Sequence, residues 1–100
     1  MHFLLFYDYV PDYLQRRDAF RDAHLRLAWQ YQQRGELILG GVVAEPIDGA
    51  VLFFKADSAE TVEAFVKSDP YVINGLVTGW KIRPWNTVVG DDATTPIHVD

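Results

Sequence analysis

The chain has 100 residues, which is enough for one domain with a hydrophobic core of modest size. A hydrophobic content of 49% excludes wholesale disorder. The formal net charge of -5 comes from nine basic and 14 acidic residues, so we expect no basic face and no nucleic-acid partner.

Cysteine is absent, which excludes disulfides, thiolate nucleophiles and zinc sites with cysteine ligands. The apolar start MHFLLFYDYV lacks the basic leader of a signal peptide and is too short to span a bilayer. No other apolar run reaches membrane length. We therefore expect a soluble, cytoplasmic protein with no membrane partner.

The first half of the chain predicts a strand and then one long amphipathic helix. Residues 2–9, HFLLFYDY, are aromatic and aliphatic and have the length of a buried strand. Pro11 ends this strand, and Asp12 is placed to cap a helix over residues 13–35. At about 100° per residue, His24 falls beside the apolar stripe of that helix. The stripe consists of Tyr13, Phe20, Leu27 and Tyr31.

The second half predicts two strands, a second helix and a last strand. The expected strands cover residues 36–44, 50–56 and 76–84. Asp57 is placed to cap a helix over residues 58–68, and Asp69-Pro70 ends it because the residue before proline is pushed out of helical space. Residues 71–75 are expected to form a turn. The domain is expected to cover residues 1–90, followed by a flexible acidic tail over residues 91–100.

This order of elements predicts an α+β fold of the ferredoxin-like βαββαβ type, an antiparallel sheet with two helices on one face. The other face is then bare and apolar, and such a patch on a soluble protein usually meets a partner. The simplest partner is a second copy, which predicts a homodimer through the open sheet face. The side chains expected there are Trp80, Ile38 or Val43, and either Leu4 with Phe6 or Phe3 with Leu5.

His24 is the first candidate for a functional group. An imidazole takes up and returns protons near neutral pH, so it can serve as a general acid or base. The alternative is a structural histidine at the edge of the core, held by a hydrogen bond. The position of His24 in the sequence leaves both interpretations open.

Asp69 is the second candidate. A carboxylate there can hold a histidine N–H and fix the tautomer of the ring. The alternative is an Asx turn that ends the helix, which is the commoner situation at Asp-Pro.

Four further residues are candidates for binding a ligand. Arg17 can hold an anionic group with two hydrogen bonds, Gly40 and Gly41 can offer backbone N–H groups, and Tyr71 can line a pocket. A solvated arginine, a β-bulge and a packed tyrosine are the structural alternatives. The histidines have no metal-ligand spacing and no cofactor motif occurs, so we expect neither a metal nor a cofactor.

Two short motifs carry a resemblance to the YciI-like (YCII-related) family. They are RDAHL, which contains Arg21 and His24, and DPYV, which begins at Asp69. The segments FLLFYDY, GELILGG and LVTGWKIRPW extend the match over most of residues 2–89. The resemblance implies a ferredoxin-like domain that dimerises as an α+β barrel, and a pocket in which His24 and Asp69 form an acid/base dyad.

The known chemistry of that family includes dehydrochlorination of a chlorinated aromatic compound. The resemblance and the residues together suggest a small-molecule enzyme that carries out a lyase-like or isomerase-like step on an aromatic or anionic metabolite. The alternative is a non-catalytic module that binds a small ligand or helps to assemble a complex. The chain has Gly41-Val42 where many members have Gly-Pro, a departure that changes the expected wall of the pocket.

Overall fold

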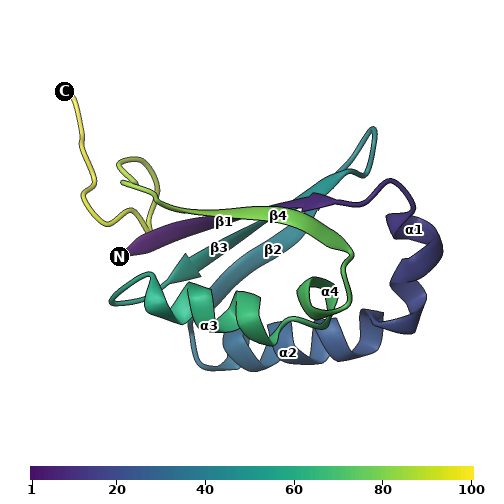
Figure 1. Cartoon of the computed structure of the whole chain (residues 1–100). Coiled ribbons are helices and arrows are strands. Elements are labelled where there is room, and N and C mark those ends of the chain that lie inside the picture. Colours follow the sequence, from purple (N-terminus) through teal and green to yellow (C-terminus); the bar gives the residue numbers. More distant parts are fainter.

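The computed structural model describes all residues 1–100 and has the element order expected from the sequence. Four strands and a set of short helices follow one another in a βαββαβ arrangement (Figure 1). The strands are β1 (His2–Tyr9), β2 (Leu37–Val43), β3 (Gly49–Lys55) and β4 (Val77–Pro84). The helical elements are α1 (Tyr13–Arg16), the 3-10 turn η1 (Arg17–Ala19), α2 (Arg21–Gln33), α3 (Glu60–Ser68) and α4 (Pro70–Ile73).

The four strands form one antiparallel sheet in the order β2-β3-β1-β4. The helices lie on one face of this sheet, and the opposite face carries none (Figure 1). The α+β ferredoxin-like fold predicted from the sequence is therefore confirmed. None of the helices has the length and apolar character that a membrane crossing requires.

The core lies between the sheet and the helices. Alternate residues of β1 point into it, and Phe3, Leu5 and Tyr7 are buried while Phe6 is exposed. From the helix side, α3 contributes Val62 and Phe65, whose side chains are fully buried. This alternation is what a sheet covered on one face requires.

The prediction of a single long helix over residues 13–35 is wrong. The chain breaks at Phe20, whose backbone (φ -123°, ψ -3°) is not helical, so that α1, η1 and α2 are separate pieces. The two ends of the expected stripe pack on different partners. Tyr13 stacks on Tyr9 at the end of β1, whereas Tyr31 packs edge-on against Phe65 of α3. A straight helix would have to serve both contacts at once, and the break lets the chain turn between them.

Two expected helix caps and one turn also differ from the prediction. Neither Asp12 nor Asp57 makes a capping hydrogen bond, because α1 has no side-chain cap and α3 begins only at Glu60, after Ala59. Residues 71–75 do not form a simple turn, because Pro70–Ile73 makes a helical turn with Asp69 as its N-cap.

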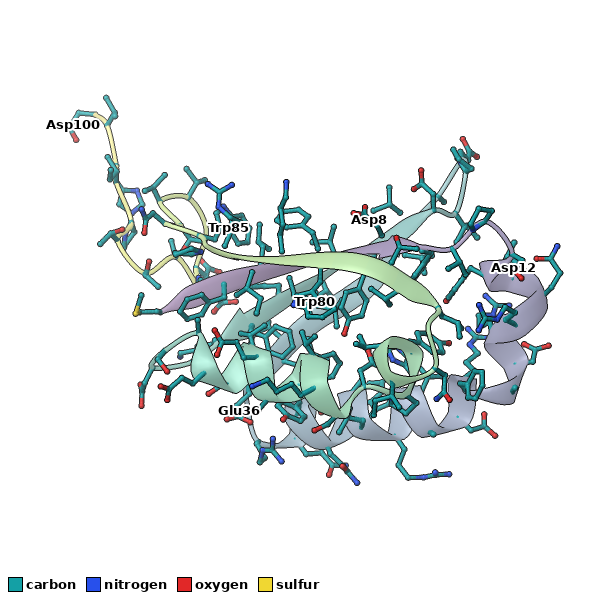
Figure 2. All side chains as sticks on the ribbon, in the orientation of Figure 1. Asp8, Asp12, Glu36, Trp80, Trp85 and Asp100 are labelled. Carbon is teal, nitrogen blue, oxygen red and sulfur yellow. The ribbon has the colours of Figure 1, made fainter.

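The bare face of the sheet carries Leu4 and Phe6 rather than Phe3 and Leu5. The placement of Trp80 on that face is wrong. Trp80 pairs with Tyr7 across β1 and β4, so both side chains point to the helix side, and Figure 2 shows Trp80 below the sheet with the helices. Val43 pairs with Gly49, which in turn pairs with Asp8 on the bare side, whereas Ile38 lies at a register shift in β2.

The C-terminal segment folds back on one end of the bare face. Trp85 packs edge-on against Phe53, and the backbone N–H groups of Thr95 and Ile97 donate to the carbonyl groups of Thr87 and Val88. The segment beyond β4 is drawn on the side of the sheet opposite the helices (Figures 1 and 2). The flexibility expected for residues 91–100 stays a prediction.

Candidate active site

Asp69 stands at the junction of two helices and serves both. It is the C-cap of α3 and the N-cap of α4, with an extended backbone (φ -73°, ψ 119°) that proline at position 70 favours. Its side chain accepts a hydrogen bond from the backbone N–H of Tyr71 at 3.0 Å. The Asx-type cap considered as a structural alternative is thus present, and it orients the carboxylate.

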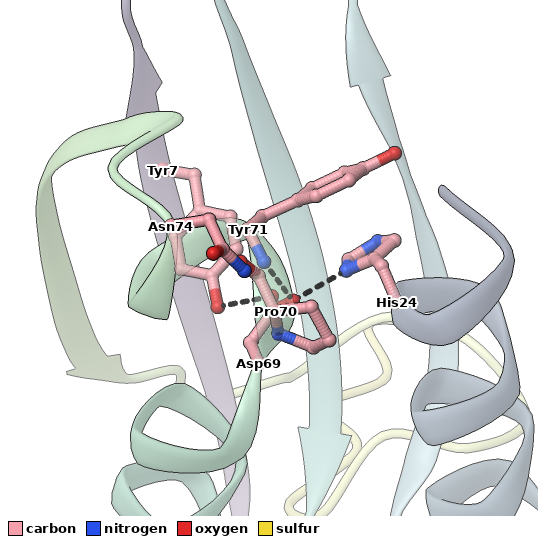
Figure 3. Close-up of polar contacts among 6 residues, drawn as sticks. All are labelled: Tyr7, His24, Asp69, Pro70, Tyr71 and Asn74. Atoms are coloured by element: carbon pink, nitrogen blue, oxygen red, sulfur yellow. Dashed lines mark hydrogen bonds and ion pairs between the residues drawn. The ribbon is translucent and has the colours of Figure 1, made fainter. Parts of the chain in front are cut away.

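The carboxylate of Asp69 is completely buried and has three hydrogen-bond donors around it (Figure 3). Tyr7 donates its hydroxyl to Oδ2 at 2.8 Å, and the Nδ1 atom of His24 lies 2.7 Å from Oδ1. A buried carboxylate is tolerated only when it is hydrogen-bonded in this way. Burial and the adjacent Asp69 carboxylate raise the pKa of Tyr7, so the hydroxyl stays protonated and remains a donor.

His24 comes to Asp69 from the first turn of α2, across 45 positions of sequence. The imidazole ring lies flat against the ring of Tyr71, with centroids 3.8 Å apart and planes 8° from parallel. The ring is therefore fixed on one edge by the carboxylate and on one face by the tyrosine. An ionised carboxylate only accepts hydrogen bonds, so the contact with Asp69 favours the tautomer with the hydrogen on Nδ1, in which Nε2 has a free lone pair.

No protein group hydrogen-bonds Nε2 of His24, and the side chain is 13% exposed. The exposed part belongs to a cavity of about 490 Å³ between α2 and β2. In Figure 3 the ring turns one edge to Asp69 and the other edge away from it. The arrangement therefore offers a proton acceptor, oriented from behind by Asp69, to whatever occupies the cavity.

The cavity is mostly apolar, with 12 hydrophobic residues among the 18 that line it. The four residues expected to bind a ligand all contribute to its walls: Arg17, Gly40, Gly41 and Tyr71. Arg21, Leu25 and Trp29 line it from α2 as well. A concave, largely apolar site with a few polar groups is the usual form of a small-molecule pocket.

The two glycines of β2 differ in their surroundings. A Cβ atom added to Gly40 would lie 3.4 Å from Cγ of Leu52, whereas one added to Gly41 would meet nothing within 4 Å. Gly40 therefore lies close to the Leu52 side chain of the neighbouring strand β3, and Gly41 borders open space. Because β2 is an edge strand, bonded only to β3, some of its backbone N–H groups have no partner strand.

A cluster of tyrosines closes the end of the cavity near α1. Tyr9 and Tyr13 stack with centroids 3.8 Å apart, and Tyr71 meets the Tyr13 ring edge-on at 5.7 Å. Burial first, and then the neighbouring Tyr13 hydroxyl, raise the pKa values of Tyr9 and Tyr71. These hydroxyls are consequently neutral at any working pH.

Sequence reasoning did not predict the hydrogen bond between Tyr7 and Asp69. The alternation within HFLLFYDY puts Tyr7 on the same side as Leu5, but nothing in the sequence says which buried carboxylate lies beneath it. The contact joins residues 62 positions apart. No group of three or more His, Cys, Asp or Glu side chains lies close enough to hold a metal ion.

The fold and this site define an α+β domain of the YCII type. The model of the YCII-related domain matches residues 1–86, and the chain belongs to that family. No curated protein matches it.

A solved structure with the same fold is the 5-chloro-2-hydroxyhydroquinone dehydrochlorinase of Burkholderia phenoliruptrix, in complex with 2,5-dihydroxybenzoquinone. It is 25% identical in sequence, with a TM-score of 0.77. The similarity covers 87% of this chain and 95% of that enzyme.

Proposed function

We propose that this chain is a small-molecule enzyme that moves a proton with the dyad of His24 and Asp69. The observation that carries the proposal is the free Nε2 edge of His24, which borders the cavity while Nδ1 lies 2.7 Å from a buried carboxylate. In this role Asp69 holds the ring in one tautomer and stabilises it when it becomes protonated. The similar dehydrochlorinase supports the proposal, since it acts on a small ring compound.

The chemistry that suits these groups is elimination or isomerisation of an aromatic or anionic metabolite. His24 takes a proton from a C–H or O–H bond of the ligand, and the electron pair of that bond forms a double bond. In elimination, a leaving group departs with its bonding pair; in isomerisation, His24 returns the proton to another atom. Arg17 and the N–H groups of Gly40 and Gly41 stabilise oxygen charge, and Tyr71 supports the ring of His24.

A homodimer through the bare face of the sheet is part of this proposal. Leu4, Phe6 and Val43 give that face an apolar centre, and an uncovered apolar sheet face favours burial against a second copy. Sedimentation at micromolar concentration tests it, and a monomer would refute it. The cytoplasmic location expected from the sequence stays a prediction.

The alternative is a non-catalytic ligand-binding module. It uses the same pocket, and His24 only forms a hydrogen bond with the ligand. Chloride release from 5-chloro-2-hydroxyhydroquinone, measured for the wild type and for His24→Gln, separates the two. The proposal predicts release by the wild type and at least about a hundredfold loss in the variant, a usual size for a general base. Tight binding of that compound, with no release and no proton exchange at its ring carbons, would favour the module.

A further inference from the structure

The cavity beside the dyad has an unusual charge for this chain. The whole protein carries a net charge of -5, yet no aspartate or glutamate lines the cavity. The ionisable lining groups other than tyrosines are Arg17, Arg21 and His24. The carboxylate of Asp69 lies behind His24 and is fully buried. A positively charged pocket concentrates anions through its local electrostatic field, even when the protein as a whole is negatively charged.

Neither arginine side chain has a hydrogen-bond acceptor within the protein. Nε of Arg17 is buried and has no hydrogen-bond partner, and the nearby carboxylate of Asp18, 3.8 Å away, is exposed to solvent. No hydrogen bond or ion pair joins Arg21 to a protein group either. Their neighbour Arg16 differs, because its guanidinium donates to the carbonyl group of Asn74 at 2.9 Å. A buried donor without a partner, such as Nε of Arg17, is costly, and a bound oxyanion would satisfy it. The exposed guanidinium of Arg21 is free to bind the same anion.

The two arginines lie on either side of the break in the long helix. Arg17 begins η1 and Arg21 begins α2, on either side of the non-helical Phe20, and both line the same walls. The Arg17 guanidinium also lies 5.9 Å from the centre of the Tyr13 ring. Arg17 and Arg21 thus form the positively charged end of the cavity.

Tyr71 contacts the dyad and also lies near the positive charges of the two arginines. Its ring lies on His24, and its hydroxyl extends away from Asp69 (Figure 3). The positive charges of Arg21 and Arg17 act on that hydroxyl and oppose the rise in its pKa. His24 and the two arginines line one cavity of about 490 Å³, a volume that suits a ligand of single-ring size.

We propose that the pocket takes a planar oxyanion of single-ring size, whose carboxylate or phenolate is held by Arg17 and Arg21 while its ring lies among the apolar walls next to His24. This inference rests on the proposed function, because it names the class of ligand for the same site. It commits the pocket to molecules that are both aromatic and anionic. Neutral compounds of the same shape bind weakly, because they leave both guanidinium groups without an acceptor.

Titration of the isotope-labelled protein with benzoate, followed by NMR through the indole N–H of Trp29, tests this inference. Benzamide is the neutral match of benzoate, and 4-nitrophenolate is the phenolate probe. We expect benzoate or 4-nitrophenolate to bind at least about tenfold more tightly than benzamide, and the tighter of the two tells which oxyanion the site prefers. If neither anion binds more tightly than benzamide, or if neither anion shifts the Trp29 signal, the inference is overturned.

The variants Arg17→Gln and Arg21→Gln should each weaken the binding of the preferred anion about tenfold, and leave benzamide within about twofold. Arg26→Gln is the matched control, because Arg26 is an exposed arginine of α2 outside the cavity. If the arginine variants bind the anion like the wild type, the inference fails.

The variant His24→Gln separates this inference from the proposed function. It should lose turnover and keep the anion affinity within about threefold, because the arginines and not the imidazole hold the charge. Loss of anion binding in His24→Gln with normal binding in both arginine variants would overturn the anion site and leave the acid/base proposal intact.

Discussion

Two histidines of this chain, His2 of the sheet and His24 of helix α2, meet different surroundings. His2, at the start of β1, is 4% exposed, and its Nδ1 atom lies 2.8 Å from Oγ1 of Thr87. Its ring packs edge-on against Phe53, beneath the returning C-terminal segment. His24 also has a partner at Nδ1, but its other edge borders a cavity. Both rings are oriented by a hydrogen bond, and only one of them is accessible to a ligand.

This difference shows why a hydrogen-bonded histidine alone does not identify a site. Thr87 is neutral and is itself used by the backbone N–H of Thr94 at 2.8 Å, so its bond to His2 fastens the tail. Asp69 can carry a full charge and is fixed by two other donors, Tyr7 and Tyr71. A histidine with an anionic, rigid partner on one edge and open space on the other has what general acid/base chemistry needs.

The largest effect is expected from removing the centre of the polar network. Asp69→Ala leaves the Tyr7 hydroxyl, the Tyr71 N–H and the His24 ring without their buried acceptor, so we expect a loss of about 3–5 kcal/mol in the free energy of unfolding. Urea denaturation measures it. Asp57→Ala is the control at an exposed aspartate without a capping bond, and it should change stability by less than about 0.5 kcal/mol. A loss below about 1 kcal/mol for Asp69→Ala would mean that the network is not formed.

Replacing each histidine by alanine compares the two environments directly. His2→Ala removes a buried ring and leaves Thr87 with one partner fewer, which should cost about 2–3 kcal/mol in the free energy of unfolding. His24→Ala opens space that joins the cavity, where water can reach Asp69, and should cost less than about 1 kcal/mol. Urea denaturation of the two variants side by side measures both losses. A larger loss for His24→Ala than for His2→Ala would make His24 the structural histidine.

Tyr7→Phe removes one donor from the carboxylate without changing the shape of the core. We expect a loss of about 1–1.5 kcal/mol in the free energy of unfolding, since Oδ2 of Asp69 loses its hydrogen bond and stays buried. Thermal unfolding followed by circular dichroism measures this loss. Tyr31→Phe is the matched control, because Tyr31 is also buried but its charged neighbour is the exposed Arg34 rather than a buried carboxylate. An equal effect in both variants would show that the Tyr7 contact contributes nothing.

The smallest effect concerns pH. Burial, together with the N-terminal amine and Lys55, lowers the pKa of His2 below 6.5, although Asp92 acts in the opposite direction. The unfolded chain therefore binds this proton more readily than the folded chain does. The contribution of neutral His2 to the free energy of unfolding is fully present above pH 6.5. It is lost as the pH falls toward the lowered pKa of His2 in the folded protein. As the pH is lowered below 6.5, the urea midpoint of the wild type should fall more steeply than that of His2→Phe. If the two midpoints change with pH in parallel, the lowered pKa of His2 is contradicted.

The sequence predicts the strands well because their residue types are distinctive. The expected strand over residues 2–9 coincides with β1, and the other three agree to within about a residue at most ends. Periodicity also gave the sets of residues that share a face. It could not say which set faces the helices, and Trp80 was placed on the wrong side because its pairing with Tyr7 depends on the register between strands far apart in sequence.

The break at Phe20 had no local signal, since the segment from Tyr13 to Arg34 contains neither glycine nor proline. It follows from tertiary contacts of Tyr13 and Tyr31, which a single-helix pattern cannot reveal. The same limitation applies to the site. His24 and Asp69 are paired by the resemblance, whereas the contact of Tyr7 with Asp69 and the buried Nε of Arg17 without a hydrogen bond emerge only from the folded structure.

The most direct test of the central claim is the tautomer of His24, read from the ring nitrogen chemical shifts of the labelled protein at pH 9. The account predicts a protonated Nδ1 held by Asp69 and an Nε2 with the shift of an unprotonated nitrogen, and Asp69→Asn should weaken that preference. A hydrogen on Nε2 in the wild type would mean that no base faces the cavity, and it would contradict the proposed chemistry.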